Sequence, residues 1–271
     1  MKRLVVALTA IAAFTAPALA ADMAAKAPLR AAPAAYAPSW TGCYLGAGGG
    51  GGFYDLETQL VTAPPVVPAG VPTNVRLDQG GRGWLATVGG GCDYQFTGLS
   101  GGIFGSGIVI GAFADGDWTN IRGQHTGQDR NVGLIAGEMK LDWSWAVGGR
   151  AGILITPNLL TYFSAGYTEA QFSGTTYFGF NGLATGLAVP SQRYQGWFIG
   201  AGDEYALNFL PGLFWKTEYR FAEYDRKTLP VFFTATGLPN GVGESTRPFT
   251  HTIRSELTYH FNWGGPLVAK Y

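Results

Sequence analysis

Charged side chains are scarce in this chain. It has 18 basic and 18 acidic residues among 271, or 13%, whereas about 25% is usual for soluble domains. Because the two signs balance, no net field attracts the molecule to a nucleic acid or to an anionic surface. The charge content therefore argues against nucleic-acid binding and against an ordinary soluble domain.

Histidine and cysteine are almost absent as well. Three histidines, His125, His251 and His260, are the candidates for a general base, and no Ser-His spacing typical of a hydrolase stands out. Cys43 and Cys92 lack the neighbouring histidines of a zinc site. We expect no enzymatic activity, no metal ion and no cofactor. A lipid-modifying enzyme that uses His251 or His260 is the alternative.

Long apolar runs are missing beyond the N-terminus. Lys2 and Arg3 precede an apolar run from Leu4 to Phe14, and a small-residue cleavage site follows at Ala18–Ala20. This order is that of a signal peptide over residues 1–20. No later segment has the ~18 apolar residues of a spanning helix, so the exported chain is either soluble or crosses a membrane as strands.

Glycine and aromatic residues are abundant instead. The chain has 42 glycines and 14% aromatic residues. Residues 21–39 are rich in alanine and proline and predict an extended periplasmic linker. Residues 40–271 contain segments of about ten residues with alternating character, which is typical of a membrane β-barrel.

Alternation is clearest in LDWSWAVGGRAGI, residues 141–153. Tryptophans and aliphatic residues fall on one face, and aspartate, serine, glycine and arginine fall on the other. Residues 214–221 and 251–261 repeat this scheme. Since the charged face suits a narrow polar interior, we place the aromatic face toward lipid.

Eight strands are predicted, with short turns alternating with long loops. Long extracellular loops at 54–82, 116–140, 173–194 and 225–250 and short periplasmic turns are the arrangement of outer-membrane barrels. The fold class is therefore all-β, an eight-stranded antiparallel transmembrane β-barrel. The predicted strands are 40–53, 83–96, 103–115, 141–153, 160–172, 195–207, 214–221 and 251–261.

The inward face of these strands collects charges of both signs. Eight strands enclose an interior that side chains just fill, so opposite charges there should pair and close the lumen. A narrow or gated pore for small solutes is the alternative. The predicted lumen charges are Asp142, Arg150, Glu204, Lys216, Glu218, Arg220, Arg254 and Glu256.

The outward face carries two further features. Cys43 and Cys92 lie at similar depths on the first two strands, which permits a disulfide; two free thiols are the alternative. Aromatic residues suit girdles at the two membrane interfaces. The predicted lipid-facing aromatic residues are Trp143, Trp145, Trp197, Trp215, Tyr219, Tyr259 and Phe261.

Four segments carry a family resemblance: ADMAAKAP, WTGCYLGAGGG from Trp40, GWFIGAGDEYAL with the following KTEYRFAEYD, and the terminal HTIRSELTYHFNWGGPLVAKY. They resemble the porin-like outer-membrane proteins of rhizobial type, also called outer-membrane immunogenic proteins and akin to the OmpA barrel domain. The resemblance implies an eight-stranded barrel without the peptidoglycan-binding domain of OmpA. Cys43 and Asp203 depart from the family pattern, and Asp203 fits best at the periplasmic interface.

The resemblance also implies a cellular setting. The C-terminal alternation of Tyr259, Phe261 and Trp263, with the terminal Tyr271, resembles the signal that the barrel-assembly machinery reads. We therefore expect an outer-membrane location, lipids and that machinery as partners, and a structural role at the surface. Binding of a host or environmental ligand through the long loops is the alternative. The sequence does not indicate an oligomeric state.

Overall fold

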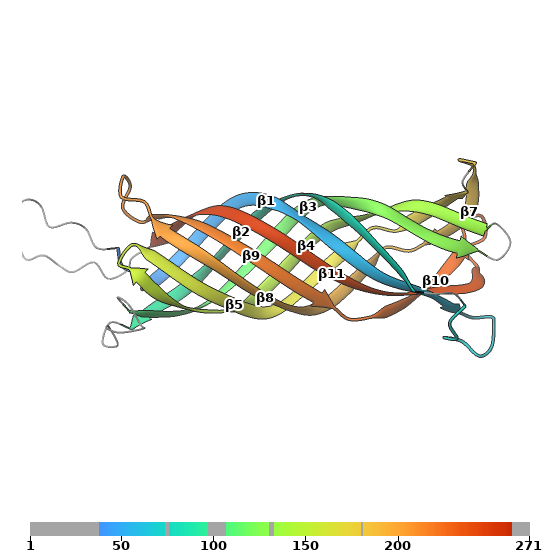
Figure 1. Ribbon diagram of the computed structural model, residues 1–271, viewed down its shortest axis with the longest axis horizontal. Coiled ribbons are helices and arrows are strands. Elements are labelled where there is room, and N and C mark those ends of the chain that lie inside the picture. The colour runs from blue at the N-terminus through green and yellow to red at the C-terminus, as the bar shows by residue number, and fades with distance from the viewer. Residues whose placement is uncertain (1–37, 74–75, 97–106, 130–132, 180, 262–271) are drawn as a thin grey trace, which may run out of the picture. The chain divides into compact units, whose positions relative to one another are not determined.

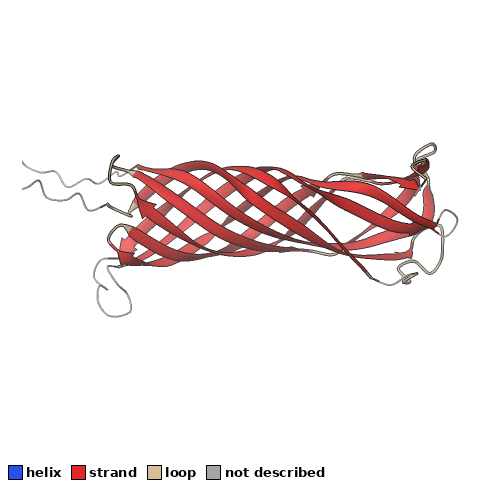
Figure 2. Ribbon diagram, turned by 45° about the horizontal axis from the view of Figure 1, so that its top comes forward, coloured by secondary structure: helices blue, strands red, loops and turns tan. Residues whose placement is uncertain are grey.

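The computed structural model describes residues 38–73, 76–96, 107–129, 133–179 and 181–261. All regular elements in these ranges are β-strands (Figure 2). No helix among them is long and apolar enough to cross a membrane. The predicted signal peptide, nearly all of the linker, and the aromatic residues Trp263 and Tyr271 lie outside the described residues. The strands belong to one compact unit, residues 37–271.

Eleven strands follow one another in the described ranges. They are β1 (Gly42–Thr62), β2 (Leu77–Phe96), β3 (Ile108–Asp129), β4 (Gly133–Thr156), β5 (Leu159–Phe172), β6 (Thr175–Gly179), β7 (Ala184–Val189), β8 (Gln192–Ala206), β9 (Leu213–Tyr224), β10 (Lys227–Phe233) and β11 (Pro239–Phe261).

Eight of the strands close into a ring. Their order is β1-β2-β3-β4-β5-β8-β9-β11, and β1 pairs with β11 to complete it. That closing ladder is antiparallel and runs from Cys43 opposite Phe261 to Thr62 opposite Val242. The tilted strands wind around the barrel in Figure 1. The predicted fold class, an eight-stranded antiparallel barrel, is confirmed.

The other three strands continue the wall of the barrel beyond this ring. Two-residue interruptions separate β5 from β6, β7 from β8, and β9 from β10. Above the interruptions the ladder passes from β4 through β6, β7 and β10 to β11. Pro190, which cannot donate a backbone hydrogen bond, stands in one of the gaps. We call this upper part of the wall the extension.

The extension corrects the prediction of four long irregular loops. Most of residues 54–82, 116–140, 173–194 and 225–250 is strand. The side-chain pattern inverts there: on β1, Tyr54 and Leu56 face inward and are buried, whereas Asp55 is exposed and Glu57 partly exposed on the outside. A sheet surrounded by water has polar residues outside and apolar residues inside. The extension has this pattern, and the lipid-facing pattern of the lower strands ends below it.

Exposed aromatic residues mark where lipid surrounds the barrel. Trp84 and Tyr94 are both 56% exposed, and they are ten residues apart on β2. Ten steps of ~3.4 Å on a strand tilted by ~45° give a height of about 24 Å, close to the ~25 Å apolar band of such barrels. A ring of outward-facing aromatic residues lies just below the extension, and we call it the outer aromatic belt. Its members are Phe53, Trp84, Trp118, Trp145, Tyr167, Trp197, Phe221 and His251.

Candidate functional site: the charged interior of the barrel

Inward-facing side chains fill the barrel in layers, which can be followed along β4. Leu154 belongs to an apolar cluster near the short turns, and Arg150 lies in a charged layer above it. Leu141 and Met139 belong to a second apolar cluster, and Ile135 to a third inside the extension. The charged layer, which we call the lumen network, consists of Asp93, Asp115, Asp117, Arg150, Glu204, Lys216, Glu218, Arg220, Arg254, Glu256 and His260.

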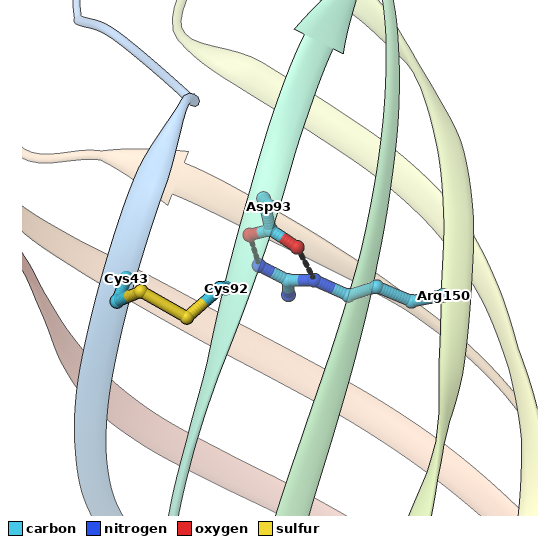
Figure 3. Close-up of a disulfide and its surroundings, with 4 residues drawn as sticks. All are labelled: Cys43, Cys92, Asp93 and Arg150. Atoms are coloured by element: carbon cyan, nitrogen blue, oxygen red, sulfur yellow. Dashed lines mark hydrogen bonds and ion pairs between the residues drawn. A yellow bond between two sulfur atoms is a disulfide. The ribbon is translucent and has the colours of Figure 1, made fainter.

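Arg150 joins three strands at the end of the network nearest the short turns. Its Nε donates to Oδ1 of Asp93 at 3.0 Å, and Nη2 donates to the other oxygen of that carboxylate (Figure 3). Nη1 donates to Oε2 of Glu204 at 2.7 Å. The rings of Tyr44 and Tyr162 lie 4.6 and 5.1 Å from the guanidinium carbon. Two carboxylates and two aromatic faces thus replace the water that this cation gives up.

A second group of ion pairs crosses the lumen. Arg220 of β9 donates to both oxygens of Asp115 of β3, at 2.9 and 2.8 Å. These two strands stand opposite each other in the ring of eight. Arg254 of β11 also binds Asp115, at 2.9 Å, and donates to Asp117 at 2.6 Å. The centre of the barrel is therefore bridged from wall to wall by charge-assisted hydrogen bonds.

The remaining members complete the pairing. Lys216 lies 2.9 Å from Glu256. Glu204 accepts from the Thr258 hydroxyl at 2.6 Å and lies 3.0 Å from Nε2 of His260. Since these groups are almost fully buried, each one depends on its partners in place of solvent.

Comparisons with known proteins agree with this architecture. No family model matches the chain. It is 29% identical over 270 residues to the "31 kDa outer-membrane immunogenic protein" of Brucella melitensis, which covers 94% of this chain and 98% of the relative, and equally similar to the protein of that name from Brucella suis. The crystal structure of the outer membrane protein OprG from Pseudomonas aeruginosa superimposes with a TM-score of 0.51 over 83% of this chain and 99% of OprG, at 11% identity.

The chain is an outer-membrane β-barrel protein. The two Brucella proteins confirm the resemblance to outer-membrane immunogenic proteins, and OprG supports the fold alone. The expected outer-membrane location is thereby confirmed. The outer-membrane barrel places seven of the eight predicted lumen charges inside, and Asp142 is the exception.

Asp142 was placed wrongly because the strand is irregular there. The ladders of β4 with β3 and with β5 both shift register around this residue. The bulge moves Leu141 from the predicted outward face to the interior, and Asp142 instead pairs with Lys140 at 3.1 Å, with both side chains partly exposed. A bulge inserts one unpaired residue and so reverses the alternation of side chains beyond it.

Sequence reasoning missed three aspartates of the network. Asp115 and Asp117 lie on β3 where the sequence predicted the end of a strand and a loop. Asp93 follows Cys92 within a predicted strand, and alternation from an outward Cys92 would have placed it inside. All three are acceptors for the arginines named above.

The two cysteines are joined by a disulfide. Cys43 of β1 and Cys92 of β2 occupy directly opposed positions of the ladder. Figure 3 shows the bond beside Asp93, the residue that follows Cys92 and holds Arg150. Consecutive residues of β2, Cys92 and Asp93, therefore hold the disulfide on the outside and a carboxylate of the lumen network on the inside.

The predicted lipid-facing aromatic residues lie on the exterior of the outer-membrane barrel. Trp143 is half-buried because the guanidinium of Arg193 lies over its ring, 5.1 Å away. The other six are exposed: Trp145, Trp197, Trp215, Tyr219, Tyr259 and Phe261. Asp203 lies near the C-terminal end of β8, beside the short turns, where it accepts from the Thr161 hydroxyl at 2.5 Å.

Two of the three histidines are buried against carboxylates, and the third contacts a tyrosine hydroxyl on the outside of the barrel. His125 is fully buried in the extension and lies 2.8 Å from Glu244, whose other oxygen accepts from Tyr177. His260 is buried against Glu204. His251 faces outward in the outer aromatic belt, with its Nδ1 2.7 Å from the Tyr219 hydroxyl. Among the described residues no group of three or more His, Cys, Asp or Glu is arranged to hold a metal.

Proposed function

We propose that the protein has a structural role in the outer membrane and that its lumen is closed and does not conduct solutes. The observation that carries the proposal is the pair of guanidinium groups, Arg220 and Arg254, that meet Asp115 across the interior. An ion that entered would have to part these buried pairs, and each separated charge would cost several kcal/mol.

Single-channel recording tests the proposal. The refolded chain without residues 1–20 is inserted into a planar bilayer, and its shifted migration on an unheated gel verifies that the barrel has formed. We expect no discrete conductance steps. Steps from folded barrels, absent in lipid alone, would overturn the proposal.

A narrow water-filled passage is the second candidate, and one observation favours it. Within the described residues, Oδ1 of Asp117, Oγ1 of Thr87 and Nε of Arg254 are buried without a protein hydrogen-bond partner. Buried polar atoms of this kind normally bind ordered water. Water inside the network would allow protons or small ions to move, and the same recording at acidic and neutral pH distinguishes this candidate from a dry plug.

We further propose that the extension is the part through which the protein acts at the cell surface. On β3, eleven residues separate Trp118 of the belt from the end of the strand at Asp129, which corresponds to about 26 Å above the membrane. The Brucella relatives are named immunogenic, and a wall that rises this far is accessible to antibodies. Ligand binding by its loops remains the alternative, tested by replacing loops 63–73 and 234–238 and measuring adhesion.

No catalytic role enters the proposal. The accessible histidine, His251, lies at the lipid interface against Tyr219, and the two buried ones are held by carboxylates. Loss of a lipid modification in a His251→Ala variant would contradict this assignment. The outward Tyr259 and Phe261 at the end of β11 support the proposal that the barrel-assembly machinery recognises this strand.

A further inference from the structure

An apolar groove of about 690 Å³ crosses the outside of the barrel on β3, β4, β5, β8 and β9. Its sides are carbon-rich side chains that face lipid, among them Phe163, 74% exposed, and Ile199, 52% exposed. The groove lies below the outer aromatic belt, on the wall that the membrane surrounds. Hydrocarbon is therefore the medium that fills it.

Small residues create the groove. Gly149 of β4 stands opposite Ala165 of β5, and Ala201 of β8 stands opposite Phe163 of β5. A side chain at Gly149 would meet nothing nearer than a backbone oxygen at 3.6 Å, whereas one at the inward Gly148 would meet backbone at 2.4 Å. The backbone thus requires glycine at 148 but not at 149, where the absent side chain leaves external space.

The length and shape of the groove suit one extended hydrocarbon chain. It crosses four gaps between neighbouring strands, which at ~4.8 Å each amounts to about 19 Å. Between lipid and protein the hydrophobic effect contributes little, so selection rests on van der Waals packing. A flexible acyl chain that lies along the small residues makes the van der Waals contacts that would be missing if the groove were empty.

Charge at the two ends of β8, which crosses the groove, indicates which leaflet supplies the acyl chain. One end of the groove lies at Phe221, in the outer aromatic belt. Beyond that belt are Arg193, whose side chain is 57% exposed although 3.8 Å from Glu169, and Lys227, whose Nζ donates to the Arg193 carbonyl. At the other end of β8, outside the groove, the outward charge is acidic, Asp203. Phosphate groups are attracted to the two basic side chains above the belt and repelled by Asp203 at the other end of β8.

We infer that this groove binds one acyl chain of a phosphorylated outer-leaflet lipid, with the lipid headgroup beside Arg193 and Lys227. The groove opens on the outside of the barrel, and the inward residues Arg150 and Ser164 are among its lining residues. Binding in the groove does not depend on whether the lumen conducts. The bound lipid covers Ala165 and Gly149 and packs against Phe163 and Ile199.

Native mass spectrometry of the protein extracted from outer membranes in mild detergent tests the inference. Ala165→Phe fills the middle of the groove. Ala47→Phe is the matched control, because Ala47 also faces outward, on β1 at the opposite wall of the ring. Heat-modifiable migration on a gel verifies that each variant is folded. If Ala165→Phe does not fold, Ala201→Leu takes its place.

We expect the native chain and Ala47→Phe to retain one lipid with the mass of lipid A, and Ala165→Phe to retain at least tenfold less. Arg193→Gln combined with Lys227→Gln should weaken retention while the groove remains open. Equal retention by the two phenylalanine variants would overturn the inference. So would a retained phospholipid in place of lipid A, or a dimer of this chain that only Ala165→Phe dissociates.

Discussion

Arg150 links β4 to β2 and β8 through two buried carboxylates. Removing its side chain would leave Asp93 and Glu204 charged without this partner in the interior. We expect Arg150→Ala to lower the free energy of unfolding by about 3–5 kcal/mol, measured by urea unfolding in lipid vesicles with tryptophan fluorescence.

Arg122→Ala is the control for this measurement. Arg122 lies 3.3 Å from Glu138, and both side chains are more than half exposed, so its loss should cost no more than about 1 kcal/mol. Equal effects of the two substitutions would show that burial does not strengthen the lumen pairs.

The disulfide acts mainly on the unfolded chain. Cys43 and Cys92 are 49 residues apart, and opening a loop of that length releases conformational entropy worth roughly 4 kcal/mol. We expect the double variant Cys43→Ser and Cys92→Ser to unfold at a lower urea concentration than the native chain. A reductant should lower the unfolding midpoint of the native chain by a similar amount. Alkylation of both thiols without reductant would instead show that the bond is absent.

At the scale of strands, the sequence predicted the elements that contact lipid and missed those that stand in water. Residues 141–153 and 214–221 alternate between aromatic and charged residues, so both were recognised as strands. The upper halves of β1 and β3 alternate as well, but with the faces exchanged. The glycines Gly123 and Gly127 in β3 and the four prolines between residues 64 and 72 after β1 favoured loops instead. The bulge at Asp142 left no signal in the sequence, because it arises from pairing with two neighbouring strands.

The exchange of faces predicts where the membrane ends. Phe53 belongs to the outer aromatic belt, and Glu57 lies four residues higher on the same face of β1. With both native cysteines in the disulfide, we expect a water-soluble maleimide to label Glu57→Cys quickly and Phe53→Cys at least tenfold more slowly in vesicles. Similar rates at the two positions would place the boundary elsewhere.

Tyr177 of β6 makes the extension sensitive to high pH. Burial and the neighbouring Glu244 raise the pKa of Tyr177 well above its usual value. The unfolded chain releases this proton near pH 10, so the contribution to stability is full below that pH and is lost as pH rises further. The stability difference between pH 9 and pH 11 should therefore be smaller in Tyr177→Phe than in the native chain.

For the whole molecule, closure of the ring and the inward direction of seven charges followed from the sequence, but their partners did not. Alternation along one strand tells which face a side chain takes. It does not tell which side chain it meets across the lumen, since that depends on the stagger of all eight strands. Asp115 and Arg220 are 105 residues apart and pair because their strands stand opposite.

Orientation in the membrane gives a further prediction for the whole molecule. Val67, 88% exposed in the loop between β1 and β2, should lie outside the cell, and the turn at Pro157 between β4 and β5 should face the periplasm. A protease site inserted after Val67 should be cut on intact cells, and one inserted after Pro157 only after the outer membrane is opened. The reverse result would show that the barrel has the opposite orientation in the membrane.

The ladder between β1 and β11 also sets an order of events in time. Its partners stand at the two ends of the described barrel, Cys43 opposite Phe261, so the last strand must be synthesised before the ring can shut. Pairings this distant in sequence form slowly. The β1–β2 hairpin, locked by its disulfide, can be complete in the periplasm long before. The outer edge of β1 would then stay unpaired, as a template for the strand that arrives last.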